Sequence, residues 1–311
     1  MSANPIGAAR LTPRDWALLG FLTLFWGINW PIMKAGVSGP SAVPPLFFRT
    51  LSMWLGLPVL AAVLVVLRVP FRIERRHWRE LAVLTVVNMI VWHVLAIVCL
   101  QALSSGRAAI LGYTMPIFSA LVGAALFGER LAARQVAGVV ACAAAVGFLL
   151  WHELAALGGR PVAALGMLVA AAVWGYGTQR MRRTTIEAPT LAIVFWMTVA
   201  TAVFMTLATA VVERDRWAVP GGAALWAIVF NAVLIFGYAQ PAWLILARKL
   251  PPIASTMSVM MIPVLGVVSG AWFLQERLYW QDGAAIVLIL AAIALVIARP
   301  SAPRDPDSRA G

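Results

Sequence analysis

Residues 189–212 read PTLAIVFWMTVATAVFMTLATAVV and carry no charged side chain. A bilayer core of about 30 Å requires roughly 20 apolar residues in helical form, and this stretch is long enough. A helix also satisfies its own backbone N–H and C=O groups, which lipid cannot do. The stretch is therefore predicted to be a transmembrane helix.

Nine further stretches have the same character, and the chain of 311 residues is 62% hydrophobic and only 12% charged. A soluble domain needs more charge to cover its surface. Cys99 and Cys142 lie inside apolar runs and are interpreted as packing residues. We predict an all-α integral membrane protein with ten transmembrane helices, at 15–36, 43–67, 79–101, 105–127, 135–151, 161–181, 189–212, 223–246, 253–274 and 280–298.

The net charge of +12 has two explanations, a nucleic-acid partner or basic cytoplasmic loops. With the N-terminus inside, the outer loops receive only Arg160, Arg214, Arg216 and Arg277. This bias predicts that both termini are cytoplasmic, and it removes the need for nucleic acid. The cytoplasmic side receives Arg10, Arg14, Arg68, Arg72, Arg75, Arg76, Arg79, Arg130, Arg134, Arg180, Arg182, Arg183, Arg248, Lys249, Arg299, Arg304 and Arg309.

The two halves of the chain match at a nearly constant offset. Trp26-Gly27 recurs 148 residues later as Trp174-Gly175, Pro116 recurs as Pro263, and Glu129-Arg130-Leu131 recurs as Glu276-Arg277-Leu278, the last two 147 residues apart. Because each half holds five spans, the second half is predicted to be inverted around a central cavity, as in many secondary transporters. The predicted units are an N-terminal tail 1–13, repeats 14–151 and 161–299, a linker 152–160 and a disordered tail 300–311.

Several motifs along the chain resemble one family. They are Phe25-Trp26-Gly27-Ile28-Asn29-Trp30, Pro45 with Phe47-Phe48-Arg49, Tyr113-Thr114-Met115-Pro116, Phe127-Gly128-Glu129-Arg130-Leu131, Met261-Ile262-Pro263 and Gln275-Glu276-Arg277-Leu278. The set resembles the EamA-type branch of the drug/metabolite transporter superfamily, and most closely the aromatic amino acid exporters of bacterial inner membranes.

The resemblance carries over to single residues. Trp92-His93 stands where those exporters carry an aromatic–histidine pair, and Tyr113 matches their fourth-helix tyrosine. Trp174 resembles a cavity tryptophan, whereas Met115 stands where some of them carry a tryptophan. The resemblance implies a bacterial inner-membrane exporter of neutral or zwitterionic metabolites, such as aromatic or bulky amino acids, that works by alternating access.

The residues themselves indicate where a solute would bind. Trp26, Trp92, Tyr113, Trp174 and Tyr238 are predicted to form an apolar box with polar edges. His93 is the one histidine deep in a span, where it either lines the cavity or bonds a neighbouring helix. Tyr113 and Asn231 are predicted to line the cavity, while cavity lining and helix–helix bonding stay equally open for Asn88 and Gln179.

Charges and prolines near these helices have two interpretations each. Lys34 and Arg49 lie toward the outer side, where they either attract a carboxylate or form part of an outer gate, or else snorkel and bind carbonyls. All twelve acidic residues fall at span ends, in loops or in tails, which disfavours cationic drugs and a carboxylate proton relay. Pro116 and Pro263 are predicted to kink their helices and to serve as hinges.

Transport of a small molecule has several alternatives. An exporter of drugs or other metabolites is the nearest alternative, and a non-transporting receptor or scaffold is an alternative of another class. An enzyme is disfavoured because the spans lack a zinc-protease motif, a nucleophile elbow and a His/Asp/Glu cluster. The sequence predicts no metal and no cofactor. The predicted partners are the bilayer and the solute, and the chain is predicted to function as a monomer.

Overall fold

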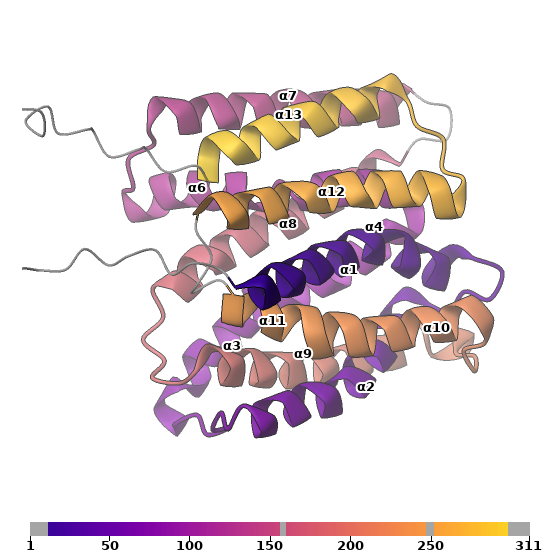
Figure 1. The fold of residues 1–311 in the computed structure, drawn as a ribbon. Coiled ribbons are helices and arrows are strands. Elements are labelled where there is room, and N and C mark those ends of the chain that lie inside the picture. The colour runs from indigo at the N-terminus through magenta and orange to yellow at the C-terminus, as the bar shows by residue number, and fades with distance from the viewer. Residues whose placement is uncertain (1–11, 156–159, 247–251, 298–311) are drawn as a thin grey trace, which may run out of the picture.

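The computed structural model describes residues 12–155, 160–246 and 252–297, and every regular element in these ranges is helical (Figure 1). Eight helical stretches are long and apolar enough to cross a membrane, and Met260–Leu274 and Trp280–Val296 are shorter apolar helices. Together they confirm the ten predicted spans. The single-helix spans are α1 (Pro13–Ser38), α2 (Pro45–Val66), α7 (Ala133–Ala155), α8 (Pro161–Arg182), α9 (Thr190–Val212), α12 (Pro252–Leu274) and α13 (Trp280–Ile297).

The other three spans are divided. The third consists of η1 (Arg75–His77), α3 (Trp78–Thr85), the π-helix η2 (Val86–Ile90) and α4 (Val91–Ala102). The fourth consists of α5 (Ser105–Gly112) and α6 (Met115–Phe127). The eighth consists of α10 (Gly222–Phe230), the π-helix η4 (Asn231–Ala239) and α11 (Gln240–Leu246), and it follows the short η3 (Arg214–Arg216).

The two π-helices occupy equivalent places in the two repeats, because a shift of 147 residues places η2 inside η4. A π-helix widens the helical turn and often lies at a functional site. Hydropathy does not distinguish it from an α-helix, so the sequence did not predict either segment.

The two related prolines have different surroundings. Pro116 lies in the first turn of α6, directly after the break at Tyr113-Thr114, where a missing N–H costs no helical hydrogen bond. Pro263 lies inside α12, which continues to Leu274. The fourth span is therefore interrupted near its proline, whereas the ninth is one helix.

Contacts between the halves follow the internal repeat. A Cβ added to Gly27 of α1 would lie 2.4 Å from Leu265 Cβ of α12. The equivalent Gly175 of α8 makes the same close approach to α6, where an added Cβ would lie 2.9 Å from both the carbonyl carbon and Cβ of Phe118. Leu265 and Phe118 are themselves 147 residues apart, so the first helix of each repeat packs on the fourth span of the other.

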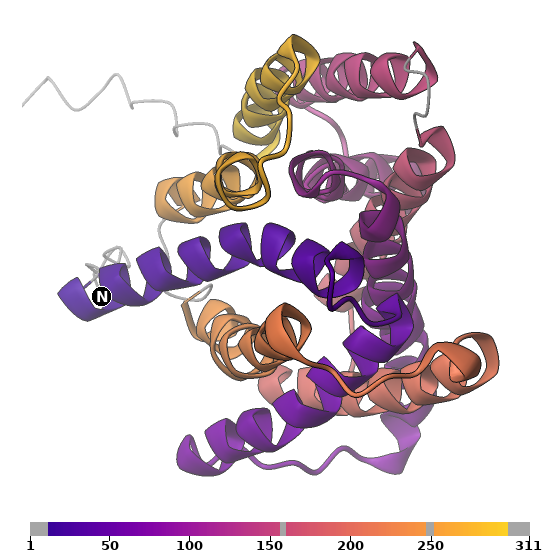
Figure 2. The ribbon, with the colours of Figure 1, turned by 90° about the vertical axis from the view of Figure 1, so that its right-hand side faces the viewer.

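The ends of α6 and α12 also match. Gly128 and Gln275 follow these helices with φ of +68° and +53°, and Glu129 N and Glu276 N donate to the carbonyls of Gly123 and Gly270 at 3.0 and 3.4 Å. Both helices therefore end at a residue with left-handed backbone, and the next N–H bonds back to a carbonyl of the helix. The fifth span of each repeat begins at an equivalent residue, and α7 and α13 lie side by side at one edge of the bundle (Figures 1 and 2).

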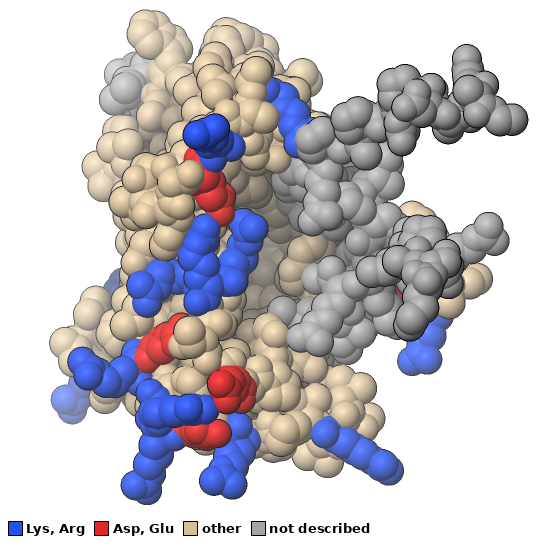
Figure 3. Space-filling view, turned by 90° about the vertical axis from the view of Figure 1, so that its left-hand side faces the viewer, with Lys and Arg blue, Asp and Glu red and all other residues tan. Residues whose placement is uncertain are grey.

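The bundle has two ends that differ in charge. We call the end where α1 begins and α13 ends the basic end, and the opposite end the far end (Figure 1). Figure 3 shows Lys and Arg gathered on the basic end, which is hollowed beside them. Among the described residues, the basic residues at the helix ends there are Arg14, Arg68, Arg72, Arg75, Arg76, Arg79, Arg130, Arg134, Arg180, Arg182 and Arg183.

Candidate functional site

Three indole rings from three helices meet in the bundle. Trp30 of α1 and Trp92 of α4 have ring centroids 6.5 Å apart, and Trp92 and Trp174 of α8 are 5.2 Å apart, both in edge-to-face geometry. Gly112, at the end of α5, leaves room for them, since an added Cβ would lie 3.1 Å from atoms of both Trp30 and Trp92. We call Trp30, Trp92 and Trp174 the tryptophan cluster.

The tryptophan cluster lies between the two repeats, because Trp30 and Trp92 belong to the first and Trp174 to the second. Trp30 is buried, whereas Trp92 and Trp174 are half-buried. Edge-to-face rings leave apolar faces with polar N–H tips, an arrangement that suits a planar or bulky apolar group. Sequence reasoning omitted Trp30 from the site, although its place one helical turn after Trp26 was a usable signal.

A second group of residues surrounds Arg49, a charged residue of α2. Its side chain is buried, and it donates from Nη1 to Asn231 Oδ1 at 3.3 Å and from Nη2 to Met33 Sδ at 2.8 Å. The guanidinium carbon lies 6.0 Å from the ring centroid of Phe236, whose ring is 5.8 Å from that of His93. Arg49, Met33, His93, Asn231 and Phe236 are called the arginine cluster below.

The two clusters adjoin through shared helices. Trp30 and Met33 are three residues apart on α1 and therefore share a face, and Trp92 and His93 are consecutive on α4. Phe236 and Asn231 belong to η4, which packs against α2. The described residues of the two clusters thus combine aromatic surface with a buried cation.

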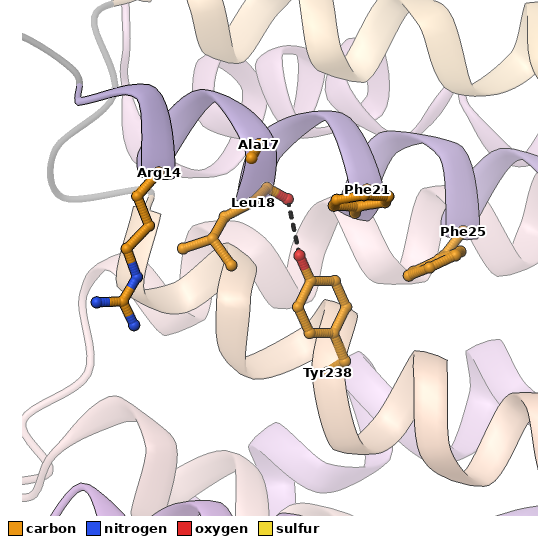
Figure 4. Close-up of a pocket in the computed structure, with 6 residues that line it drawn as sticks. All are labelled: Arg14, Ala17, Leu18, Phe21, Phe25 and Tyr238. Carbon is orange, nitrogen blue, oxygen red and sulfur yellow. Dashed lines mark hydrogen bonds between the residues drawn. The ribbon is translucent and has the colours of Figure 1, made fainter.

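Two of the predicted box residues lie elsewhere. Trp26 pairs with Trp243 of α11 at 5.8 Å, and the Tyr238 hydroxyl donates to the Leu18 carbonyl at 3.1 Å. Tyr238 lines a cavity of about 360 Å³ near the start of α1, and Figure 4 shows its ring below that helix. The residues around this cavity are Arg14, Ala17, Leu18, Phe21, Phe25 and Tyr238. Trp26 and Tyr238 therefore lie apart from Trp92 and Trp174.

The predicted amide residues make different contacts. Asn88 Nδ2 donates to the Leu84 carbonyl of its own helix at 3.1 Å, and its side chain packs against Gly177 of α8. Gln179 Nε2 donates to the Ser119 carbonyl at 2.8 Å and so joins α8 to α6. Both amides are thus engaged at helix–helix contacts, whereas Asn231 presents its oxygen to Arg49.

The remaining predicted residues lie at helix ends or at the helix break. Lys34 Nζ donates to the carbonyls of Leu100 and Gln101 at 3.0 and 2.9 Å, and it thereby satisfies the end of α4. Tyr113, Met115 and Pro116 are half-buried at the junction of α5 and α6, and Tyr113 packs against the main apolar core.

Comparison with known proteins agrees with this architecture. The model of the EamA-like transporter family matches residues 15–151 and 161–298, once over each half. The chain belongs to the EamA-like transporter family. The family match therefore confirms a multi-pass transporter with two related repeats.

Relatives of this EamA-family chain include an uncharacterized transporter, YoaV, of Bacillus subtilis (25% identical, 84% of this chain, 89% of the relative). The aromatic amino acid exporter YddG of Ancylobacter novellus is 26% identical over 88% of this chain and 97% of the exporter. The uncharacterized inner membrane transporter YedA of Escherichia coli K12 is 25% identical over 92% of this chain and 91% of the relative. A crystal structure with a TM-score of 0.64 and 22% identity, covering 91% of this chain and 96% of the other, shares the fold.

Proposed function

We propose that this EamA-family protein exports bulky neutral or zwitterionic metabolites, such as aromatic amino acids, across a bacterial inner membrane. The observation that carries the proposal is the tryptophan cluster, which lies where the two repeats meet. Transporters built from inverted repeats bind their solutes at such an interface. The 26% identity to an aromatic amino acid exporter favours the same class of solute.

The basic end faces the cytoplasm in this proposal, since cytoplasmic loops of membrane proteins carry an excess of Lys and Arg. Both termini then lie inside. The hollow in the basic end would give the solute its entry (Figure 3). The far end is the exit, and it has to open once in each cycle.

Two related carboxylates suggest how access alternates. At the far end, Glu276 accepts hydrogen bonds from Ser105 N, Ser105 Oγ and Gly106 N at 2.7, 2.9 and 3.3 Å, which joins α12 to the start of α5. At the basic end, the equivalent Glu129 lies 2.6 Å from Arg183 and 4.0 Å from Arg182. We propose that Glu276 closes the exit in this state. In the opposite state, Glu129 would accept hydrogen bonds from backbone N–H groups at the start of α12, the segment equivalent to α5.

The test is flux of labelled amino acids into proteoliposomes that contain the purified protein. Saturable flux that favours phenylalanine or tryptophan over alanine and lysine is expected. Trp174→Ala should raise the apparent KM for phenylalanine about tenfold, since an aromatic contact contributes about 0.5–1.5 kcal/mol beyond area burial. Trp151→Ala removes an exposed tryptophan of α7 and should leave flux unchanged. Absence of flux of every amino acid from a folded protein would contradict the proposal.

A further inference from the structure

We infer that Arg49 binds a carboxylate of the transported solute, and that the site accepts aromatic or bulky carboxylates that have no amino group. This inference rests on the proposed transport function and specifies the chemical group that the site recognises. Neither the internal repeat nor the tryptophan cluster explains why a cation is buried here, and the inference gives this cation a role.

The first observation is that Arg49 is buried without a negative partner. Only 3% of its surface is exposed, and no carboxylate in residues 12–155, 160–246 or 252–297 lies within ion-pair distance of it. Its two hydrogen-bond acceptors are an amide oxygen and a thioether sulfur, which is a weak acceptor. A charge taken out of water is costly unless it is paired, and charged side chains inside membrane spans usually serve a function.

A second observation is that Arg49 retains a free donor. Its Nε is buried and makes no hydrogen bond to the protein. A guanidinium binds a carboxylate with two parallel N–H groups, and Nε together with one terminal nitrogen forms such a pair. The contacts to Asn231 and Met33 hold Arg49 from its two terminal nitrogens, so they orient the group that carries this donor.

The third observation comes from His93 on a different helix. Its Nδ1 is also buried and unbonded, and its ring lies against the same Phe236 ring that faces Arg49. Two unsatisfied polar groups from α2 and α4 therefore lie next to the same phenylalanine. A carboxylate near Phe236 would give both groups a partner, with Nδ1–H of His93 donating a hydrogen bond to one oxygen.

The charges of the site indicate whether the solute also needs an amino group. Among the described residues of the two clusters, Arg49 carries the only formal charge, and this charge is positive. The buried acids of the described chain are engaged at helix ends: Asp15 at the start of α1, Glu213 at the start of α2, and Asp282 with Arg107. An ammonium group would thus find no carboxylate in the site, whereas the tryptophan cluster offers an apolar surface to an uncharged ring. The solute therefore needs its carboxylate and ring, and it does not need its amine.

Three probes with one ring separate these requirements. They are phenylalanine, 3-phenylpropionate, which lacks the amine, and phenethylamine, which lacks the carboxylate. In proteoliposomes with the wild-type protein, unlabelled 3-phenylpropionate should inhibit labelled phenylalanine flux at least as strongly as phenylalanine does. Phenethylamine should require at least tenfold higher concentrations. Labelled 3-phenylpropionate should itself be transported.

Variants then assign the effect to Arg49. Arg49→Gln should weaken inhibition by both carboxylates at least tenfold and leave the weak effect of phenethylamine unchanged, while Arg49→Lys should restore part of the affinity. Arg277→Gln is the matched control, because it removes an exposed positive charge at the far end outside both clusters. If Arg49→Gln does not fold, the comparison of 3-phenylpropionate with phenethylamine on the wild-type protein still tests whether the site requires a carboxylate.

The outcomes distinguish this inference from the transport function. Equal inhibition by phenethylamine and 3-phenylpropionate would overturn the role of Arg49 while amino acid transport stands. Inhibition by phenylalanine without inhibition by 3-phenylpropionate would show that the amine is required, which also overturns the inference. Ligand-induced thermal stabilisation of the detergent-solubilised protein by 3-phenylpropionate, with no amino acid flux, would support the carboxylate site and contradict the proposed transport.

Discussion

The carboxylate of Glu276 accepts hydrogen bonds from both the backbone N–H and the hydroxyl of Ser105, at 2.7 and 2.9 Å. Glu276 follows α12 and Ser105 begins α5, so this contact joins the two repeats at the far end of the bundle. Its counterpart in the first repeat, Glu129, is paired with Arg183. Equivalent residues of the two halves therefore have different partners.

Loss of the Glu276 charge should open the far end. Charged hydrogen bonds contribute about 1.5–3 kcal/mol and neutral ones about 0.5–1.5, so Glu276→Gln should shift the equilibrium about tenfold. Ser269 of α12 is 7% exposed and serves as a reporter after Ser269→Cys in a background without Cys99 and Cys142. In Glu276→Gln, an impermeant maleimide added at the far end should label this cysteine about tenfold faster than it does without the Glu276 change. Glu187→Gln removes an exposed charge and should have no effect; unchanged labelling in Glu276→Gln would contradict the closing role.

The tryptophan cluster predicts a difference between two tryptophans one helical turn apart. Trp30→Phe replaces the indole that contacts Trp92 by a smaller phenyl ring. The apparent KM for aromatic solutes should therefore rise about fivefold, equivalent to about 1 kcal/mol. Trp26→Phe changes a ring that contacts Trp243 instead, and its KM should stay within about twofold of the wild type. Initial rates of flux measure both. Equal effects of the two changes would mean that the cluster is not the binding surface.

The close approach of α8 to α6 predicts a stability difference between two glycines. A Cβ at Gly175 would lie 2.7 Å from Ser119 N and 2.9 Å from the Phe118 carbonyl carbon, and backbone atoms cannot move aside easily. Gly175→Ala should therefore destabilise the protein by about 1–3 kcal/mol, the range for overpacked sites. Gly147→Ala meets nothing within 4 Å and should be neutral or stabilising. Thermal unfolding in detergent compares the two, and an equal melting temperature would contradict the packing argument.

The ion pair between Arg107 and Asp282 predicts a further stability difference. Their nitrogen and oxygen are 2.8 Å apart, and their side chains are 11% and 5% exposed. Arg107→Ala would leave Asp282 buried without this partner, so the free energy of unfolding should fall by about 3 kcal/mol. Arg76→Ala breaks contacts with Glu74 and Glu187 that are more than half exposed, and it should cost less than about 1 kcal/mol. Equal losses in the two variants would exclude burial as the cause.

Residues 189–212 and nine similar stretches were sufficient to predict the ten helices. Helical backbone is the form that satisfies its own hydrogen bonds in lipid, so hydropathy determines these spans. The repeat was also readable, because Trp26-Gly27 and Glu129 recur in register, and Gly27 and Gly175 do make equivalent contacts. The substrate residues, the inverted arrangement, the tails, the linker and the monomeric state stay predictions.

The positions of side chains inside the bundle were harder to predict from the sequence. A pattern of apolar residues does not reveal which face of a helix meets which neighbour, so the predicted aromatic box combined Trp92 and Trp174 with Trp26 and Tyr238, which lie elsewhere. Residue identity likewise left two interpretations for Lys34 and Arg49. The structure places Lys34 at the end of α4 and Arg49 in the interior, without a carboxylate partner among the described residues.

The sequence alone determined that this chain forms a ten-helix membrane protein with two repeats, because the bilayer imposes length and hydrophobicity on each helix separately. Only the tertiary structure decided that α5 and α6 separate at Tyr113-Thr114, that η2 and η4 widen into π-helices, and that the tryptophan and arginine clusters adjoin. These features depend on packing between residues far apart in the chain. Such contacts arise from the joint geometry of several helices, and no single span encodes them.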